Sequence, residues 1–288
     1  MYARIRAYAH NKFRGLLWNC NYFFLRQPKV KSAIPHDPQI QEEVMENLKK
    51  NGFRIADFEI DLTEYKRFIS AARYDRFPGY YGGGKSRNFP EKSLEHFISA
   101  ELLRLSKDDI YIDVASAGAP TSEIYHDIYG VTSFQQDLIF PAGIHGNIIG
   151  GDASNMPVVD GFATKMGLHC SFEHFERDSD INFVKEARRV LSKKGKLCIV
   201  PLYLFNVYAV QTNLAGVLRN RIDFEGDATV YCAKNYGNRY GRFYDVDHFI
   251  SRIQNNIGEL KLTIYVIRNA RDVSPSCYVK FIALLEKE

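Results

Sequence analysis

The sequence predicts an α/β protein built on a doubly wound, mostly parallel sheet of seven strands with helices on both faces. Three observations predict this fold class. Between residues 106 and 288, short strand-like runs alternate with amphipathic helical segments, as βαβ units do. A small-residue turn joins the first of these strands to a helix, and an acidic residue ends the second strand. A length of 288 residues suffices for one large domain with appendages.

The first hundred residues are predicted to be helical. Apolar residues recur at helical spacing in 39–50, 61–76 and 91–105, and we expect the last of these helices to be amphipathic. The triple glycine at 82–84 separates the second helix from the third. We therefore expect residues 1–105 to form an N-terminal helical extension with a lid.

After this extension the predicted pattern changes to strands and helices in alternation. The strands are predicted at residues 110–115, 132–136, 148–150, 162–167, 196–201, 260–267 and 278–285. The helices between them are predicted at residues 122–129, 180–191 and 246–257. Residues 203–241, rich in Tyr, Asn and Arg, interrupt the alternation. We therefore predict that residues 106–288 form one domain with a substrate-cap insertion at 203–241.

Composition and charge exclude several classes of protein. The net charge of +4 is too small to predict that the whole chain binds nucleic acid. The five cysteines are scattered and form no Cys-x-x-Cys pair, so neither a disulfide framework nor a metal site is predicted. No apolar stretch has the length of a membrane-spanning helix, and no signal sequence is recognised. We expect a cytoplasmic protein.

Two segments leave alternatives open. Residues 1–36 carry basic and aromatic side chains and no acid, so they either pack as a helix on the domain or make a peripheral contact with an anionic membrane. The tyrosines, amides and arginines of the insertion suit a polar small-molecule substrate, and they equally suit the contact of a homo-oligomer.

Residues with chemical meaning follow three predicted strands. The segment 113–118 (DVASAG) is a small-residue turn, where the backbone approaches a ligand closely. Asp137 ends the second strand, where an acid can accept both hydroxyls of a ribose. Asp152 and Ala153 follow the third strand and offer a carboxylate and a backbone N–H to an adenine. Alanine disfavours positive φ, so we expect either a turn shaped differently from a glycine turn or a looser fit of the ligand.

These motifs are followed by FATKMGLH at 162–169 and by RVLSKKGK at 189–196. In this order and spacing the sequence resembles the class I SAM-dependent methyltransferases (SAM is S-adenosylmethionine) of the small-molecule, type 11-like kind. The resemblance covers residues 105–201 well. It implies a Rossmann-like fold, SAM as cofactor and S-adenosylhomocysteine as product. The implied reaction is methyl transfer to a small molecule, most simply O-methylation of a glycan or glycolipid precursor or of a secondary metabolite.

The resemblance also implies which residues contact the cofactor. A segment before the first strand closes over the methionine end in the family, and Tyr80, Tyr81 and Lys85 have that place here. The implied cofactor contacts are Asp113, Ala115, Ser116, Ala117, Gly118, Asp137, Asp152, Ala153 and Tyr81.

A general base is predicted near the carboxyl end of the fourth strand. The methyl group of a sulfonium is already activated, so a base is needed only where the nucleophile is a hydroxyl. His169 lies just beyond the fourth strand and is the first candidate, because histidine titrates near neutrality. Glu173, one helical turn further on, and His145, between the second and third strands, are the other catalytic candidates.

Two other functions stay open. The same cofactor site could serve aminocarboxypropyl transfer or cyclisation of SAM. The fold could also belong to a non-catalytic binding or scaffold protein. An NAD oxidoreductase is disfavoured because the Gly-x-Gly-x-x-Gly turn is missing.

Overall fold

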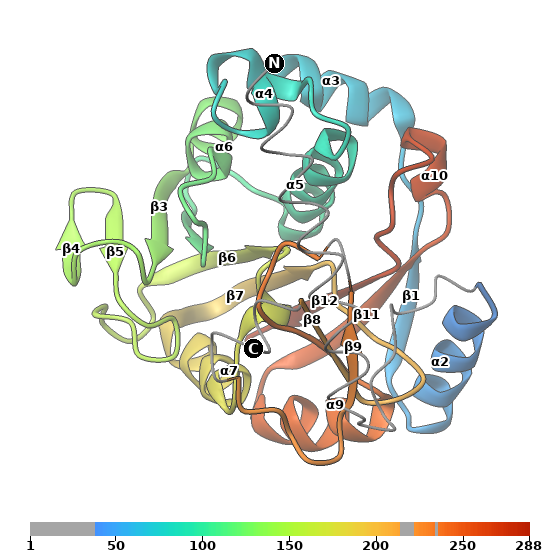
Figure 1. Ribbon diagram of the computed structural model, residues 1–288. Coiled ribbons are helices and arrows are strands. Elements are labelled where there is room, and N and C mark those ends of the chain that lie inside the picture. The colour runs from blue at the N-terminus through green and yellow to red at the C-terminus, as the bar shows by residue number, and fades with distance from the viewer. Residues whose placement is uncertain (1–37, 214–221, 234–235) are drawn as a thin grey trace, which may run out of the picture.

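The computed structural model describes residues 38–213, 222–233 and 236–288, and its central element is a nine-stranded sheet (Figure 1). The strands in spatial order are β1-β11-β12-β7-β6-β2-β3-β5-β4. Their bounds are β1 Arg54–Phe58, β2 Ile110–Val114, β3 Thr132–Asp137, β4 Gly143–His145, β5 Ile148–Gly150, β6 Ala163–His169, β7 Leu191–Val200, β11 Lys261–Ile267 and β12 Phe281–Glu286. Residues 1–36, whose role was left open, lie outside the described residues.

The prediction of a doubly wound, mostly parallel sheet is confirmed. Each of the seven predicted strands is present. If they are numbered along the chain, their order across the sheet is 3-2-1-4-5-7-6. The pairs β2–β3, β2–β6, β3–β5 and β6–β7 are parallel, whereas β12 runs antiparallel between β7 and β11. The strand order reverses at β2 and β6, and open sheets of this kind bind ligands at such a switch point.

The prediction of seven strands and of a purely helical extension is wrong in two places. β1, in the segment taken as helical, pairs in parallel with β11 from Arg54 opposite Thr263 to Phe58 opposite Ile267. β4 forms a hairpin with β5. Both strands are short, so their local pattern is too weak to separate them from the neighbouring segments, and the sheet edge decides their conformation.

Helices cover both faces of the sheet (Figure 1). Those with strand contacts on one face are α5 Phe89–Leu103 and α6 Thr121–Tyr129, with α3 Leu62–Ala72 packed on both. Those on the other face are α2 Pro38–Lys50, α7 Ser179–Val190 and α9 Val246–Arg252. Two short helices, α4 Tyr81–Gly84 and α10 Ala270–Val273, complete the set. A separate hydrophobic cluster fills the space on each face.

Helix α5 differs from its prediction. A helix with one apolar and one solvated face was expected, but most of its residues are buried, including the polar side chains Glu91, Lys92, Ser93, Glu95, His96 and Ser99. The helix has no broad solvated face, because α3, α4 and the sheet surround it. Its polar residues must therefore find partners inside the protein.

The predicted insertion forms a small second sheet. Its strands are β8 Ala209–Thr212, β9 Thr229–Cys232 and β10 Gly241–Phe243, in the order β10-β8-β9. Arg242 of β10 is fully buried and ties this sheet to the start of α7 through an ion pair of 2.7 Å with Asp180. A buried ion pair thus joins this small sheet to helix α7.

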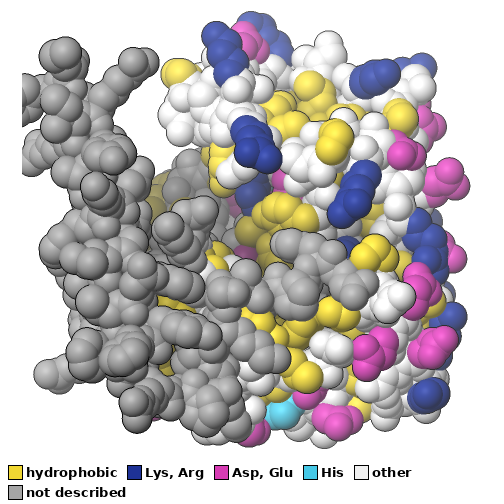
Figure 2. All heavy atoms as spheres, turned by 45° about the vertical axis from the view of Figure 1, so that its right-hand side comes forward, with side chains coloured by type: hydrophobic (Ala, Val, Ile, Leu, Met, Phe, Trp, Pro, Cys, Tyr) yellow, Lys and Arg dark blue, Asp and Glu magenta, His cyan; other side chains and the backbone are white. Residues whose placement is uncertain are grey.

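The face shown in Figure 2 carries charges of both signs. Lys and Arg side chains lie close to Asp and Glu side chains, with small hydrophobic areas between them. Charges of opposite sign at such spacing offset one another within a Debye length. Among the described residues, no helix is both long enough and apolar enough to cross a bilayer.

Candidate functional site

A cavity of about 730 Å³ lies at the switch point, where β2 and β6 end side by side. Its first wall is the turn after β2, from Asp113 to Ala119, and its second is the segment after β6, from His169 to His174. Helix α5 contributes Lys92 and His96, and the segment before it contributes Gly79, Tyr80, Tyr81 and Asn88. The cap and the C-terminal part close the cavity with Tyr203, Gln211, Tyr236, Asn238, Phe243 and Tyr278.

The turn after β2 has the left-handed backbone that glycine usually provides. Ala115 has φ 50° and Ala117 has φ 48°, so the expectation of a differently shaped turn is wrong. This conformation costs an alanine about 1–2 kcal/mol. Side chains of β3 hold it: the amide of Ala115 donates to Gln136 Oε1 at 3.2 Å, and that of Ala117 donates to Asp137 Oδ2 at 2.7 Å. A strained turn held in this way is pre-formed for close approach of a ligand.

Asp137 lies behind the turn rather than in the cavity wall. It also accepts a hydrogen bond of 3.0 Å from the amide of Ile139, so each carboxylate oxygen holds one backbone N–H. A carboxylate has about four acceptor positions, which leaves two. The neighbouring side chains Leu138 and Ile139 are 71% and 68% exposed, an unusual exposure for large apolar residues. The acid and an apolar surface thus lie together beside the turn.

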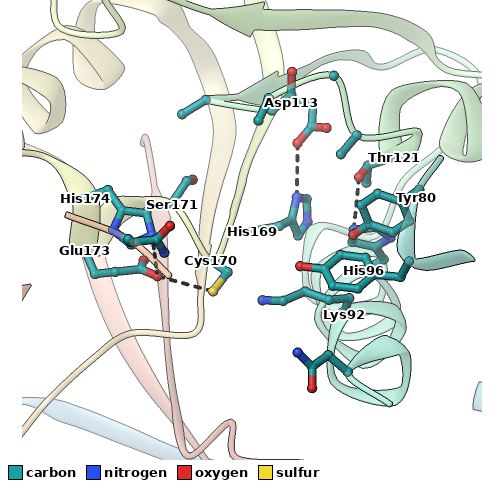
Figure 3. A pocket seen from close by; sticks show the side chains of 18 of the residues that line it. Tyr80, Lys92, His96, Asp113, Thr121, His169, Cys170, Ser171, Glu173 and His174 are labelled. Carbon is teal, nitrogen blue, oxygen red and sulfur yellow. Dashed lines mark hydrogen bonds and ion pairs between the residues drawn. The ribbon is translucent and has the colours of Figure 1, made fainter. Parts of the chain in front are cut away.

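Asp113 and His169 form a buried pair at the centre of the site (Figure 3). The Asp113 Oδ1 atom accepts a hydrogen bond of 3.0 Å from His169 Nδ1, and the two side chains are only 2% and 6% exposed. His169 Nε2 lies 3.5 Å from the hydroxyl of Tyr125, which donates its hydrogen to the carbonyl of His96 at 2.5 Å. The aspartate therefore fixes one tautomer, with the lone pair of the ring on Nε2.

In contrast to His169, His96 has close hydrogen-bond partners at both ring nitrogens. Its Nδ1 pairs with the Tyr74 hydroxyl at 2.8 Å, and its Nε2 pairs with Tyr80 at 3.1 Å and with Thr121 at 3.0 Å. Burial lowers the pKa of His96 well below its ordinary value, and the neighbouring His169 adds to this. A neutral, fully bonded His96 holds Tyr80 against the cavity.

Lys92 and Glu95 bring a second charged pair to the cavity. The Lys92 Nζ atom lies 2.7 Å from Glu95 Oε1, and Glu95 is completely buried. Burial raises the pKa of Glu95 to about 8, against the opposing effect of Lys92. Burial alone would lower the pKa of Lys92, but the carboxylate of Glu95 raises it above its ordinary value. Within this buried pair, the charge of Lys92 is therefore balanced by the carboxylate of Glu95.

The wall after β6 begins with a sharp turn. Cys170 has φ 51° and its Sγ donates to Glu173 Oε1 at 3.2 Å (Figure 3). Burial raises the pKa of the Cys170 thiol, with Glu173 acting in the same direction, so the thiol keeps its hydrogen. The Tyr203 hydroxyl lies 3.5 Å from the same sulfur. The turn places Ser171 and Glu173 in the cavity wall.

Several buried polar atoms of this cavity have no hydrogen-bond partner. They are Asp113 Oδ2, Ser116 Oγ, Ser171 Oγ and Glu173 Oε2. An unpaired buried polar group costs about 1–3 kcal/mol, and more when it is charged. Such groups are uncommon in folded proteins, so their presence in one cavity makes it the candidate site for a polar ligand.

The structure brings some of the sequence-predicted residues together and leaves others apart. Asp113, Ala115, Ser116, Ala117, Gly118, Tyr81, His169 and Glu173 all line the cavity. Asp137, Asp152, Ala153, His145 and Lys85 are not among the lining residues. Asp152 accepts hydrogen bonds from Ser154, and Ala153 is buried. His145 is exposed on β4 and pairs with the carbonyl of Ala142, away from the turn.

The sequence reasoning missed Lys92, Cys170, Ser171 and Tyr278 as residues of the site. For Lys92 a signal existed: Lys92, Glu95 and His96 share one face of the predicted helix at i, i+3 and i+4. Tyr278 carried no such signal, because β12 brings it to the cavity from the far end of the chain.

Comparison with known proteins yields structural neighbours alone. No protein-family model and no curated protein sequence matches the chain. The solved structures include a Burkholderia thailandensis 1,6-didemethyltoxoflavin N1-methyltransferase with bound 1,6-didemethyltoxoflavin and S-adenosylhomocysteine, at 10% identity and a TM-score of 0.46, covering 81% of this chain and 94% of that one. A Pyrococcus horikoshii protein, PH0226, has 16% identity, a TM-score of 0.45 and coverages of 75% and 98%.

A putative Haloferax volcanii methyltransferase, solved with a methyltransferase activator, has 10% identity, a TM-score of 0.41 and coverages of 77% and 97%. These similarities are too distant to assign an activity. By its strand order and its switch point at β2 and β6, the chain has the Rossmann-like fold of the class I SAM-dependent methyltransferases that its sequence resembles.

Proposed function

We propose that this protein is a SAM-dependent methyltransferase that transfers a methyl group to a hydroxyl of a small-molecule acceptor, such as a glycan or glycolipid precursor or a secondary metabolite. The observation that supports it most is the Asp113–His169 pair, which lines the cavity directly beside the strained turn after β2. A base held by a carboxylate next to such a turn suits hydroxyl deprotonation at a cofactor site.

The residues at the turn fit SAM. Asp113 Oδ2 and Ser116 Oγ are buried acceptors without partners, which suits the ammonium group of the methionine end. Asp137 keeps acceptor positions for ribose hydroxyls, and the exposed Leu138 beside it suits the face of an adenine. Asp152 and Ala153 stay proposals for the adenine edge, and Tyr81 for the methionine end. When bound, the cofactor supplies a methyl group activated by a sulfonium.

The chain's own residues would then handle the proton. Asp113 holds His169 in the tautomer whose Nε2 lone pair is available, because the Tyr125 hydrogen is donated elsewhere. His169 Nε2 therefore takes the hydroxyl proton of the acceptor, and Asp113 stabilises the resulting imidazolium. The Asp113–His169 pair is itself buried, and the low local dielectric strengthens this electrostatic stabilisation.

Calorimetric titration with SAM and with S-adenosylhomocysteine tests the cofactor site. We expect micromolar binding of both, lost in Asp137→Ala because the turn loses its support and the ribose its acceptor. Arg67→Ala, at an exposed ion pair of α3, is the control that keeps binding. Absence of binding to well-folded protein would overturn the proposal in favour of a non-catalytic role. Mass analysis of the product then separates methyl transfer, a gain of one methyl group, from aminocarboxypropyl transfer or cyclisation.

A further inference from the structure

The far wall of the cavity holds a buried carboxylate that has no cation of its own. Glu173 is 4% exposed, and its Oε2 atom has no hydrogen-bond partner. Its Oε1 atom accepts only the thiol hydrogen of Cys170 at 3.2 Å, a weak donor. Leaving a buried carboxylate unpaired costs several kcal/mol. The protein tolerates this cost at a position that faces the cavity.

The histidine beside this carboxylate does not compensate it. His174 Nε2 lies 3.5 Å from Glu173 Oε1, which is long for a hydrogen bond. His174 Nδ1 lies 2.5 Å from the carbonyl of Tyr240, so this nitrogen carries the hydrogen, and Nε2 accepts from the Asn238 amide at 2.8 Å. With Nε2 acting as an acceptor, it has no hydrogen to give to Glu173.

Lys92, the lysine that lines the same cavity, already has a carboxylate partner. The Lys92 ammonium pairs with Glu95 at 2.7 Å, and Glu95 itself has a second oxygen without a partner. The neighbouring Cys170 is a neutral thiol that keeps its hydrogen, so it donates to Glu173 without supplying a positive charge. Among the described residues, Glu173 therefore has no cation assigned to it, whereas Lys92 already has its carboxylate.

We propose that Glu173 and Ser171 bind a cationic amino group of the acceptor, which identifies the acceptor class as amino-substituted, hydroxyl-bearing small molecules. This inference rests on the proposed function and extends it. An ammonium ion donates three hydrogen bonds, which matches the unpaired Glu173 Oε2 and Ser171 Oγ atoms. An ammonium nitrogen has no lone pair, so the group bound here is not the nucleophile. A hydroxyl of the same molecule reaches His169, four residues before Glu173 in the same wall.

The tyrosines around this wall support the same class of ligand. Tyr203 and Tyr278 each approach Cys170 with their hydroxyls, at 3.5 and 3.8 Å from its sulfur. Burial raises the pKa of Tyr203 well above its ordinary value, so it stays a neutral hydroxyl. The ring of Tyr278 already has the Lys92 ammonium 5.9 Å from its centroid, which shows that this wall accommodates a cation beside an aromatic face. A carboxylate, a hydroxyl and tyrosine rings together recognise an ammonium better than a neutral alcohol.

Matched pairs of an amine and its hydroxyl counterpart test this inference by ligand-observed NMR on the whole protein. The probes are glucosamine against glucose, tyramine against tyrosol, and 1,4-diaminobutane against 1,4-butanediol, each with and without S-adenosylhomocysteine. We expect at least one amine to bind about 10-fold more tightly than its alcohol, as a charge-assisted hydrogen bond provides. Glu173→Gln, nearly the same in shape, should abolish this difference.

The matched control is Glu176→Gln, which removes a carboxylate of the same segment that pairs with Arg239 outside the cavity. It should keep the amine preference. Ser171→Ala is a second variant, expected to weaken the amines by a smaller factor if Glu173→Gln does not fold. No amine preference in any pair, or a preference that survives Glu173→Gln, would overturn the inference.

The two proposals fail separately in this experiment. Binding of S-adenosylhomocysteine without any amine preference would overturn the acceptor assignment and leave the methyltransferase proposal in place. An amine preference that Glu173→Gln abolishes, in a protein that does not bind S-adenosylhomocysteine, would overturn the methyltransferase proposal and leave an amine-binding site.

Discussion

Two polar clusters are buried in this molecule, and they differ in how completely they are paired. Under the cap, Arg242 donates to the carbonyls of Phe175 and Arg177 and pairs with Asp180 and Glu225. Asp180 in turn accepts from Tyr244, Arg242 and Arg252. In the cavity, by contrast, Asp113, Ser116, Ser171 and Glu173 each keep an atom without a partner.

The difference in pairing distinguishes buried charges that stabilise the fold from buried charges that can bind a ligand. A charge that is surrounded by partners from several elements holds those elements together, and removing it leaves its partners unpaired. A charge with free acceptor atoms in a cavity contributes less to the fold and is available to a ligand. In the cap cluster, Arg242 Nε alone lacks a partner among the side-chain atoms of its residue.

The largest expected effect is on the cap cluster. Arg242→Ala should lower the free energy of unfolding by about 3–5 kcal/mol, because it leaves Glu225 without its cation and Asp180 with Arg252 alone. Denaturant unfolding followed by circular dichroism measures this change. Arg239→Ala is the control: its ion pair with Glu176 is half exposed, so it should lose less than about 1 kcal/mol. Equal losses in the two variants would mean that the buried ion pairs of Arg242 stabilise the fold no more than a surface ion pair does.

The opposite pattern is expected in the cavity. Asp113→Asn should change the free energy of unfolding by less than about 1 kcal/mol, since the replaced group has one unpaired oxygen. It should reduce the rate of methyl transfer by about 10²–10⁴-fold, because His169 loses the carboxylate that fixes its tautomer. The measurement is single-turnover kinetics with an identified acceptor. Asp127→Asn, at a surface ion pair with Arg76, serves as the control and should keep full activity.

Gly167 allows a test of how tightly the residues around His169 are packed. A Cβ atom at Gly167 would lie 2.6 Å from the Tyr111 hydroxyl and 3.1 Å from the His169 ring. Gly167→Ala should therefore cost about 1–3 kcal/mol by overpacking and displace His169. Thermal unfolding and activity are measured together. Tyr111→Phe in the same chain removes the closest atom and should recover part of the stability, and failure to recover any would place the clash elsewhere.

The smallest expected effect is a dependence of cap stability on pH. Burial lowers the pKa of His248, but hydrogen bonds to Asp227 and Asp245 raise it more, so its pKa in the folded state lies above its ordinary value. This stabilisation is complete below about pH 6.5, the ordinary value, and is lost as pH rises through the folded-state pKa. Solvent screens this partly exposed group, so we expect less than about 1 kcal/mol.

Unfolding of the wild type and of His248→Gln, measured from pH 5.5 to 8.5, checks this dependence. The wild type should lose stability relative to the variant as pH rises. Parallel pH profiles would mean that the two aspartates do not act on His248. The ring also stacks on Tyr208 at 3.9 Å, and this contact should persist at every pH.

The fold was largely predictable because it rests on local pattern. Strands such as β2 and β11 are mostly apolar, and helix α6 begins after Pro120 and ends before Gly130, which has φ 72°. β1 was not predicted, because five residues with a mixed pattern become a strand only when β11 offers its edge. The burial of the polar residues of α5 was not predicted for the same reason, since it depends on the elements that surround the helix.

The candidate site was predictable where its residues sit at strand ends. Asp113 and His169 were identified because parallel strands bring their carboxyl ends to one edge, and the pairing of β2 with β6 places them together. The left-handed alanines of the turn could not be predicted, since alanine disfavours that conformation and β3 side chains 20 or more residues away hold it.

The sequence by itself determined seven of the nine strands of the main sheet, its doubly wound topology and the sheet edge that carries the candidate site, because these follow from hydrophobic period and chain order. The tertiary structure alone decided which polar groups are paired. Arg242 and Glu173 are both buried charges in the same half of the chain, and nothing in their local sequence distinguishes them. Whether a buried charge stabilises the fold or awaits a ligand depends on partners brought from distant segments, and only packing in three dimensions determines those partners.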